Sequence, residues 1–424
     1  MDETPSGIHS IKAKRVLGEF TYEIAFSSEP EDGRMRLIYA PNGRGKTNLL
    51  RAINAALSAS TDALQTLIEI PFAELTVKFV SGGTISITRE NDIIGSFKAS
   101  AFSPMQEQID IDVNSADFAG RLYRRALSER ENFTAYIKLV ADLSPGAVFI
   151  GDDRLASEFD ESPQATQADR AHRQNERRRG SVTGLLDAVE RMLTQSALVS
   201  LSRDSEQTGI YEQLTKNTLS GTARLTTSEA RSALEDQIEL LLGDGIPLEQ
   251  YQLLSMRQLR NISTQLHAAR ANDRQLPVLH QILKPYLDSL GDQIDSLAPA
   301  YELIDTYVKG VNKFLDRKEL KFTASRGIIL VGRNGDPLHP DSLSSGERHL
   351  IILLSRAILA TVTQPLLIID EPELSLGIEW QRDLIPELLR CTASASIQFI
   401  VASHSVQVMG AVESADIVSP VEAL

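Results

Sequence analysis

The sequence predicts an α/β protein with a central parallel sheet and a helical segment inserted into the chain. Residues 35–39 form an apolar run that enters a glycine-rich turn, and apolar residues from 49 to 57 then recur at helical spacing. Residues 366–369 and 397–401 are mostly apolar runs of the kind found in buried parallel strands. Between residues 182 and 314 the apolar spacing is helical almost throughout, which predicts the inserted helices.

Shorter strands predict a second, mixed sheet beside the parallel one. Alternating apolar positions near residues 22–26 indicate a strand, and residues 73–79 and 84–89 predict a hairpin. The turn between them, 81–83, contains two glycines, which adopt positive φ at little cost. The further expected elements are a helix over 115–139, a strand over 147–150, and strands within 320–338 around the turn dipeptide Asn334-Gly335.

Composition bounds the class of protein. The chain has 424 residues and a formal net charge of −14, so a surface that binds nucleic acid over its whole extent is excluded and any such contact would be local. The single cysteine, Cys391, excludes an intrachain disulfide and fits a reducing cytoplasm. The N-terminus lacks the pattern of an export signal, and no apolar run approaches the roughly 20 residues of a membrane span. We therefore expect a cytoplasmic protein without a membrane span.

The glycine-rich turn has the pattern of a phosphate-binding loop. Residues 40–47 read APNGRGKT, in which closely spaced glycines let backbone N–H groups surround phosphate oxygens. Lys46 would bind the β and γ phosphates of ATP, and the Thr47 hydroxyl would ligate Mg²⁺. Ala40 stands where this pattern usually begins with glycine. The nucleotide-binding residues predicted here are Asn42, Gly43, Arg44, Gly45, Lys46, Thr47 and Asn48.

Two carboxylates follow the apolar strand at 366–369. Asp370 is predicted to bind Mg²⁺ through water, and Glu371 is predicted to polarise the water that attacks the γ phosphate. An acidic turn after a strand is common, so this motif alone is moderate evidence. At the end of the last long strand stands His404, whose imidazole could contact a γ phosphate or position water.

A serine-glycine turn precedes a strongly apolar helix expected over residues 350–360. It offers hydroxyls, backbone N–H groups and a helix N-terminus to an anion. By itself such a turn is most often a helix cap. Its place about twenty residues before the carboxylate strand favours nucleotide binding. The residues predicted to bind nucleotide here are Ser344, Ser345, Gly346 and Glu347.

These four elements, in this chain order, resemble the ATP-binding cassette superfamily. They correspond to its phosphate loop, signature sequence, Walker B carboxylates and switch histidine. The resemblance implies a head-to-head homodimer in which Ser344 and Gly346 of one copy complete the site of the other. It also implies that residues 373–376 are the D-loop along the dimer seam. The half-site that one copy would supply consists of Lys46, Thr47, Asp370, Glu371 and His404.

The spacing of the motifs selects a branch of that superfamily. About 300 positions separate Lys46 from Gly346, roughly three times the separation in transporter cassettes, so about one domain of extra chain is inserted. SMC, RecF and the double-strand-break repair ATPases carry an arm or lobe at this place. Residues 370–376, DEPELSL, with Trp380 and Gln381 after them, resemble the AAA-type cassette ATPases related to OLD proteins and to anti-phage systems.

The predicted domain organisation follows from this resemblance. Residues 1–155 and 318–424 would form the ATPase head, and residues 156–317 a mobile loop followed by a compact helical lobe. OLD proteins continue into a TOPRIM nuclease, whereas this sequence stops 20 residues after His404, so the effector is expected to be a separate protein. The residues expected to break the lobe into short helices, and so to exclude a long coiled-coil arm, are Gly243, Gly245, Pro247, Pro277 and Pro285.

Two assignments stay open at this stage. The Q-loop could be Gln106 or Gln108 by residue type, or the segment 152–154 by topology, and an acidic surface turn explains that segment equally well. A solvated loop is favoured over a nucleic-acid contact for the basic stretch, because acidic residues dilute it and no aromatic residue interleaves. Its basic residues are Arg170, His172, Arg173, Arg177, Arg178 and Arg179.

The predicted function is that of a Mg-ATP-dependent, dimerising ATPase. The leading hypothesis is a sensor or scaffold ATPase of a bacterial anti-phage system that controls a separate effector such as a nuclease. One alternative is a RecF-like repair ATPase that binds DNA in a nucleotide-dependent way. A second alternative is a nucleotide-gated scaffold that does not hydrolyse ATP. The homodimer could assemble further in any of these cases.

Overall fold

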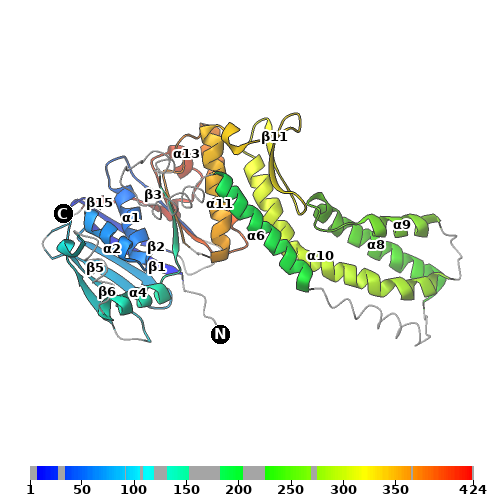
Figure 1. Cartoon of the computed structure of the whole chain (residues 1–424), viewed down its shortest axis with the longest axis horizontal. Helices are drawn as coiled ribbons and strands as arrows, with labels where there is room; N and C mark the ends of the chain where they lie inside the picture. The colour runs from blue at the N-terminus through cyan, green and yellow to red at the C-terminus, as the bar shows by residue number, and fades with distance from the viewer. Residues whose placement is uncertain are drawn as a thin grey trace, which may run out of the picture. The chain divides into compact units, whose positions relative to one another are not determined.

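The structure is a computed structural model, and its elements belong to two compact units (Figure 1). The first unit comprises residues 1–185 and 343–424, and the second comprises residues 186–342. The described residues are 7–26, 34–90, 92–105, 108–118, 131–151, 182–203, 225–268, 275–363 and 366–422.

A five-stranded parallel sheet forms the centre of the first unit. Its strand order is β14-β3-β13-β12-β8, and all four pairings are parallel. The five residues of β12 are all buried, which is why that strand is a continuous apolar run ending in one carboxylate. The predicted parallel sheet is confirmed. Its strands are β3 (Met35–Tyr39), β8 (Ala147–Ile150), β12 (Leu366–Asp370), β13 (Gln398–Ser403) and β14 (Ile417–Val418).

The second sheet of this unit has seven antiparallel strands, in the order β15-β2-β1-β4-β5-β6-β7. The predicted hairpin at 81–83 is present, with Gly82 at φ +86° and its N–H bonded to the Phe79 carbonyl at 3.0 Å. The strands are β1 (Ile8–Val16), β2 (Phe20–Ala25), β4 (Glu74–Phe79), β5 (Thr84–Thr88), β6 (Phe97–Phe102), β7 (Ile109–Val113) and β15 (Val421–Glu422).

Two features of this region differ from the prediction. Strands β6 and β7 were not expected, because their small and acidic residues, as in IDIDV, obscure the alternation that marks a strand. The helix expected over 115–139 is a short 3₁₀ segment, η1 (Ser115–Phe118), followed after a gap in the described residues by α4 (Glu131–Leu143). Within the described residues, the α-helix extends to Leu143, past the predicted end at residue 139, and residues 115–118 are 3₁₀ rather than α-helical.

Helix α1 (Lys46–Leu57) packs into the core shared by the two sheets. Its Leu49, Leu50 and Ile53 are buried together with Ile368 and Ile400 of the parallel sheet and with apolar residues of the antiparallel sheet. The phosphate loop that precedes α1 is therefore attached to the rigid centre of the unit. The other helices of this unit are α2 (Thr61–Glu69), α11 (Ser345–Thr363), α12 (Ile378–Cys391), α13 (Val406–Met409) and the 3₁₀ turn η4 (Ser414–Asp416).

Long helices dominate the second unit. Helices α8 (Thr227–Gln250) and α9 (Arg257–Ala268) run antiparallel, and Arg231 of α8 donates to the Leu266 carbonyl of α9 at 2.8 Å. α10 (Leu276–Asn312) lies alongside α8 (Figure 1), and Gln237 of α8 donates to Asp288 of α10 at 2.9 Å. α6 (Val182–Arg203) contacts α10 through the Ser296 hydroxyl, which donates to the Ser200 carbonyl.

The prediction that glycines and prolines break this region into short helices was wrong. α8 runs through Gly243, Gly245 and Pro247, and α10 has 37 residues with Pro285 inside it. An interior proline costs a helix about 3 kcal/mol and a glycine about 1 kcal/mol. Burial of one apolar face along the whole length of these helices offsets that cost.

A three-stranded antiparallel meander follows α10. It comprises β9 (Lys318–Thr323), β10 (Gly327–Gly332) and β11 (Pro337–Leu338), and the predicted Asn334-Gly335 turn joins the last two, with Gly335 at φ +83°. The Asn312 side chain both donates to and accepts from the Leu320 backbone, which joins the end of α10 to β9. Residues 318–342, including the turn η3 (Pro340–Ser342), group with the helices, although the sequence assigned them to the head.

Among the described residues, every helix is too short or too polar to cross a lipid bilayer.

Candidate functional site

Three chain segments meet where the strands of the parallel sheet end. Parallel pairing aligns Asp370 of β12 with Ala402 of β13, and Ser403 of β13 with Tyr39 of β3. The residues that follow these strands therefore lie at the same edge of the sheet. This is the edge at which open α/β sheets bind their ligands.

The loop after β3 has the backbone of a phosphate-binding loop. Gly43 and Gly45 have φ of +83° and +79°, a region in which other residues are strained. A Cβ on Gly45 would also lie 2.8 Å from Val16 Cγ1. Both the positive φ and the lack of space therefore exclude a side chain at this position. Ala40, which replaces the usual first glycine, is buried and fits there without positive φ.

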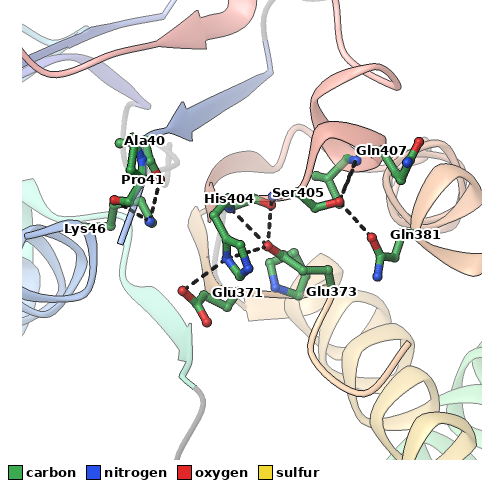
Figure 2. Close-up of polar contacts among 12 residues, drawn as sticks. Ala40, Pro41, Lys46, Glu371, Glu373, Gln381, His404, Ser405 and Gln407 are labelled. Carbon is green, nitrogen blue, oxygen red and sulfur yellow. Dashed lines mark hydrogen bonds and ion pairs between the residues drawn. The ribbon is translucent and has the colours of Figure 1, made fainter. Parts of the chain in front are cut away.

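Lys46 is the first residue of α1 and is 5% exposed. Its Nζ donates to the Ala40 carbonyl at 2.6 Å and to the Pro41 carbonyl at 3.2 Å, so the ammonium lies inside the loop that it closes (Figure 2). A buried ammonium at a helix N-terminus, beside inward backbone N–H groups, makes this loop a site for an anion.

Strand β2 supports the same loop from the antiparallel sheet. The Tyr22 hydroxyl donates to the Arg44 carbonyl at 2.5 Å, and burial raises the pKa of Tyr22 to about 12, so the hydroxyl keeps its proton at neutral pH. The Arg44 guanidinium lies over the Phe20 ring at 4.9 Å and pairs with Glu422 at 2.8 Å. Nothing local in the sequence links Tyr22 to the loop, so sequence reasoning missed it.

A pocket of about 260 Å³ opens at the loop. Glu371, which directly follows β12, lines the same pocket, so the loop at 40–47 and this carboxylate share one cavity. All seven predicted loop residues line it. The lining residues are Leu17, Asn42, Gly43, Arg44, Gly45, Lys46, Thr47, Asn48 and Glu371.

Glu371 and His404 come together across the sheet edge. His404 Nδ1 lies 3.4 Å from Glu371 Oε1 and 3.2 Å from Glu373 Oε1 (Figure 2). Glu371 has φ +48°, a left-handed backbone that non-glycine residues seldom adopt, and its N–H is bonded to the Ala402 carbonyl at 2.9 Å. Strain of this kind is often retained at functional sites.

The segment 344–347 caps α11. The Ser344 N–H donates to Glu347 Oε2 at 2.7 Å, and the Glu347 N–H donates to Ser344 Oγ at 3.3 Å, which is a capping box. Ser344 and Ser345 are exposed, whereas Gly346 is packed so closely that a Cβ would lie 2.8 Å from the Ser375 carbonyl oxygen. None of residues 344–347 lines the phosphate-loop pocket of the same chain.

Comparison with known families matches residues 203–410 to the model described as "AAA domain, putative AbiEii toxin, Type IV TA system". This match includes β12 and β13, two strands of the parallel sheet whose ends carry the site. Residues 203–410 are therefore similar to an AAA domain. The match spans the segments predicted as signature, Walker B and switch, and it begins after the predicted phosphate loop.

Solved structures similar to the chain are heads of SMC proteins. One is the Smc head domain of Pyrococcus furiosus with an extended coiled coil, bound to the C-terminal domain of ScpA. It is 13% identical with a TM-score of 0.40, and the match covers 98% of this chain and 96% of that one. Another is the Smc head domain of Pyrococcus yayanosii with a coiled coil and joint, at 14% identity and TM-score 0.36, with coverage of 99% and 97%. A third is the SMC head domain of Thermotoga maritima, at 14% identity and TM-score 0.34, with coverage of 99% and 99%. No curated protein matches the chain.

The two predicted metal ligands are oxygen donors on adjacent elements. Asp370 ends β12 and is buried, and Thr47 lies in the first turn of α1 with its side chain exposed. Within the described ranges, no group of three or more acidic, histidine or cysteine side chains could hold a metal by itself. Mg²⁺ is commonly held by one or two protein oxygens together with substrate phosphates, so this donor set fits Mg²⁺ bound with a nucleotide.

Of the predicted Q-loop candidates, only Gln108 lies among the described residues. Gln108 is exposed and donates to Asp110 of β7 at 2.7 Å, and it does not line the pocket. Gln106, the segment 152–154 and the basic stretch at 170–179 lie outside the described residues, as does the predicted mobile loop.

The sequence also gave no indication of the contacts that the Glu373 side chain makes. Residues 373–376 were assigned to the D-loop as a segment, without a partner for any side chain. Glu373 is 5% exposed, and its Oε1 accepts from the Ser403 hydroxyl at 2.6 Å and from the His404 N–H at 3.0 Å. These partners are about thirty positions away in the sequence, and no local pattern indicates such a pairing.

Proposed function

We propose that the chain is a Mg-ATP-dependent ATPase that works as a head-to-head homodimer. The observation that carries the proposal is the single pocket formed by the phosphate loop and Glu371, with His404 beside Glu371. The match to an AAA domain supports nucleotide binding. The carboxylate of Glu371 in the pocket of the phosphate loop supports hydrolysis.

Each residue of the pocket has a task in this proposal. The backbone N–H groups of residues 43–47 and the Lys46 ammonium bind the β and γ phosphates. Thr47 and Asp370 would hold Mg²⁺, which neutralises charge on the phosphates when it is bound. Glu371 accepts a hydrogen bond from the attacking water and orients it in line with the γ phosphate. His404 lies next to Glu371 and would contact the same water or a γ-phosphate oxygen.

The signature segment is proposed to act on the nucleotide of the second copy. Ser344 and Ser345 are exposed at the N-terminus of α11, and they are absent from the lining of their own chain's pocket. An exposed helix N-terminus with serine hydroxyls binds an anion well. Two copies facing each other would therefore enclose two ATP molecules.

ATP hydrolysis by the full chain tests this proposal. We expect the wild type to release phosphate from ATP, Lys46→Ala to lose ATP binding, and Glu371→Gln to bind ATP but fall at least about a hundredfold in kcat. Glu371→Gln with Mg-ATP should elute as a dimer in size-exclusion chromatography with light scattering, and the nucleotide-free wild type as a smaller species. Equal turnover by Glu371→Gln and wild type would sink the enzymatic proposal and leave a nucleotide-gated scaffold.

We further propose that the ATPase controls a separate effector, such as a nuclease, in an anti-phage system. The matching family description names a putative toxin of a toxin–antitoxin system, and this supports a defence role over general metabolism. A RecF-like repair ATPase is the alternative. ATP-stimulated, salt-sensitive binding of the wild type to DNA, without any effector, would favour that alternative.

A further inference from the structure

One buried carboxylate joins the D-loop to the switch loop. Glu373 follows β12, whereas His404 follows β13, and Figure 2 shows the Glu373 carboxylate against both the main chain and the ring of His404. Glu373 Oε1 accepts from the Ser403 hydroxyl at 2.6 Å and the His404 N–H at 3.0 Å, and lies 3.2 Å from His404 Nδ1. Both the backbone and the imidazole of His404 are therefore held by one oxygen.

The two carboxylate contacts of Nδ1 favour the tautomer that carries the proton on that nitrogen. An ionised carboxylate only accepts hydrogen bonds, so the nitrogen that faces it, Nδ1, is the protonated one. Nε2 is then left for the nucleotide or its water. Glu371 Oε1 also lies near Nδ1, at 3.4 Å, but Glu373 is closer and additionally holds the His404 backbone.

Burial of the Glu373 carboxylate lowers the stability of the fold unless its contacts compensate for the lost hydration. Glu373 is 5% exposed, and its Oε2 is buried and accepts no hydrogen bond from any described residue. A buried carboxylate with an unsatisfied oxygen costs folding free energy. Such a group is retained more readily where its contacts serve the site.

A second bridge connects the same two loops. The Ser405 hydroxyl donates to Gln381 Oε1 at 2.7 Å, and Gln381 Nε2 donates to the Leu376 carbonyl at 3.0 Å. Leu376 belongs to the D-loop segment and Ser405 to the switch loop. A movement of the D-loop would thus reach His404 through Glu373 and its neighbour Ser405 through Gln381.

We propose that Glu373 is a positioning residue that acts through His404: it holds Nδ1–H and the backbone of His404 so that Nε2 faces the nucleotide, and it transmits D-loop movement to that ring. This rests on the proposed ATPase function. In a head-to-head dimer the D-loop lies along the seam, so closure of the dimer would set the orientation of His404.

The test compares two substitutions of Glu373 with a matched control. Glu373→Met keeps the length of the side chain and removes the accepting oxygens, whereas Glu373→Gln keeps Oε1 as an acceptor. Glu387→Met is the control, because Glu387 is equally buried in the same unit but bonds Arg390 of its own helix at 2.7 Å. We expect Glu373→Met to lower kcat by roughly ten- to a hundredfold with KM for ATP nearly unchanged, Glu373→Gln to retain most of the activity, and Glu387→Met to alter Tm alone.

A double variant separates positioning from a merely structural role. If Glu373 acts through His404, Glu373→Met has no further effect on kcat in a His404→Ala background. A double variant whose loss of kcat equals the product of the two single losses would overturn the proposal. Equal losses of kcat in Glu373→Met and Glu387→Met would overturn it as well.

The ring tautomer gives a readout that does not require ATP turnover. In ¹⁵N-histidine-labelled protein at alkaline pH, with His404 assigned through His404→Ala, long-range ¹H–¹⁵N correlation should show Nδ1–H in the wild type and Nε2–H in Glu373→Met. An unchanged tautomer in Glu373→Met would mean that Glu371 alone holds the ring and would overturn the proposal. If the wild type hydrolyses no ATP, the proposed function fails, yet this measurement still decides the role of Glu373.

Discussion

At the scale of single residues, two glycines of the site are required for different physical reasons. Gly45 has φ +79° and lies against Val16, so it provides both backbone freedom and space for the phosphate loop. Gly346 has no unusual φ, but the Ser375 carbonyl leaves no room for a Cβ. Gly346 therefore lets residues 344–347 pack against residues 373–376 within one chain.

We predict that Gly346→Ala destabilises the fold and slows turnover. The new Cβ would lie 2.8 Å from the Ser375 carbonyl oxygen and 3.2 Å from the Trp380 ring, so the D-loop must shift. Overpacking of this kind costs about 1–3 kcal/mol in the free energy of unfolding. Thermal unfolding and kcat measure the two effects. Gly377→Ala, at a position with open space around it, is the matched control and should change neither by a comparable amount.

At the scale of elements, the long helices show how packing overrides helix-breaking residues. Gly243 and Gly245 both lie inside α8, but Gly243 is exposed and Gly245 is buried. A Cβ on Gly245 would lie 2.4 Å from the Met256 side chain, which is itself fully buried, whereas a Cβ on Gly243 meets nothing within 4 Å. Gly245 is thus a packing residue, and Gly243 is a weak point of the helix.

We predict that alanine has opposite effects at these two positions of α8. Gly243→Ala should raise the free energy of unfolding by about 0.5–1 kcal/mol, because alanine loses less backbone entropy in a helix. Gly245→Ala should lower it by about 1–3 kcal/mol, because Met256 has to move. Urea denaturation of the two variants measures both values. A stabilising Gly245→Ala would show that Met256 yields at no cost.

At the scale of the whole molecule, the proposed homodimer rests on where the predicted nucleotide-binding residues lie in one chain. The phosphate loop, Glu371 and His404 lie at one sheet edge, and the exposed serines of α11 stand outside that pocket. In the proposed homodimer, each copy would hydrolyse ATP only when a second copy faces it. The proposed control of a separate effector would use the opening and closing of those pairs.

We predict that the ATP-trapped form holds the effector in the host cell. Glu371→Gln, tagged and purified from its own host with Mg-ATP, should enrich one partner protein over Lys46→Ala, which cannot close on ATP. Mass spectrometry identifies that partner. Enrichment of a nuclease or another toxic enzyme supports the defence role, whereas enrichment of replication or repair proteins contradicts it.

The sequence by itself determined the features whose physical cause is local. A glycine spacing that permits inward N–H groups predicts the loop at 40–47. Uninterrupted apolar runs predict β12 and β13, because strands buried on both faces of a parallel sheet need apolar side chains throughout. Only the tertiary structure decided the contacts between distant segments. The bond from Glu373 to His404 spans 31 positions, and the length of α10 depends on burial along its partners, so neither is encoded in a local pattern.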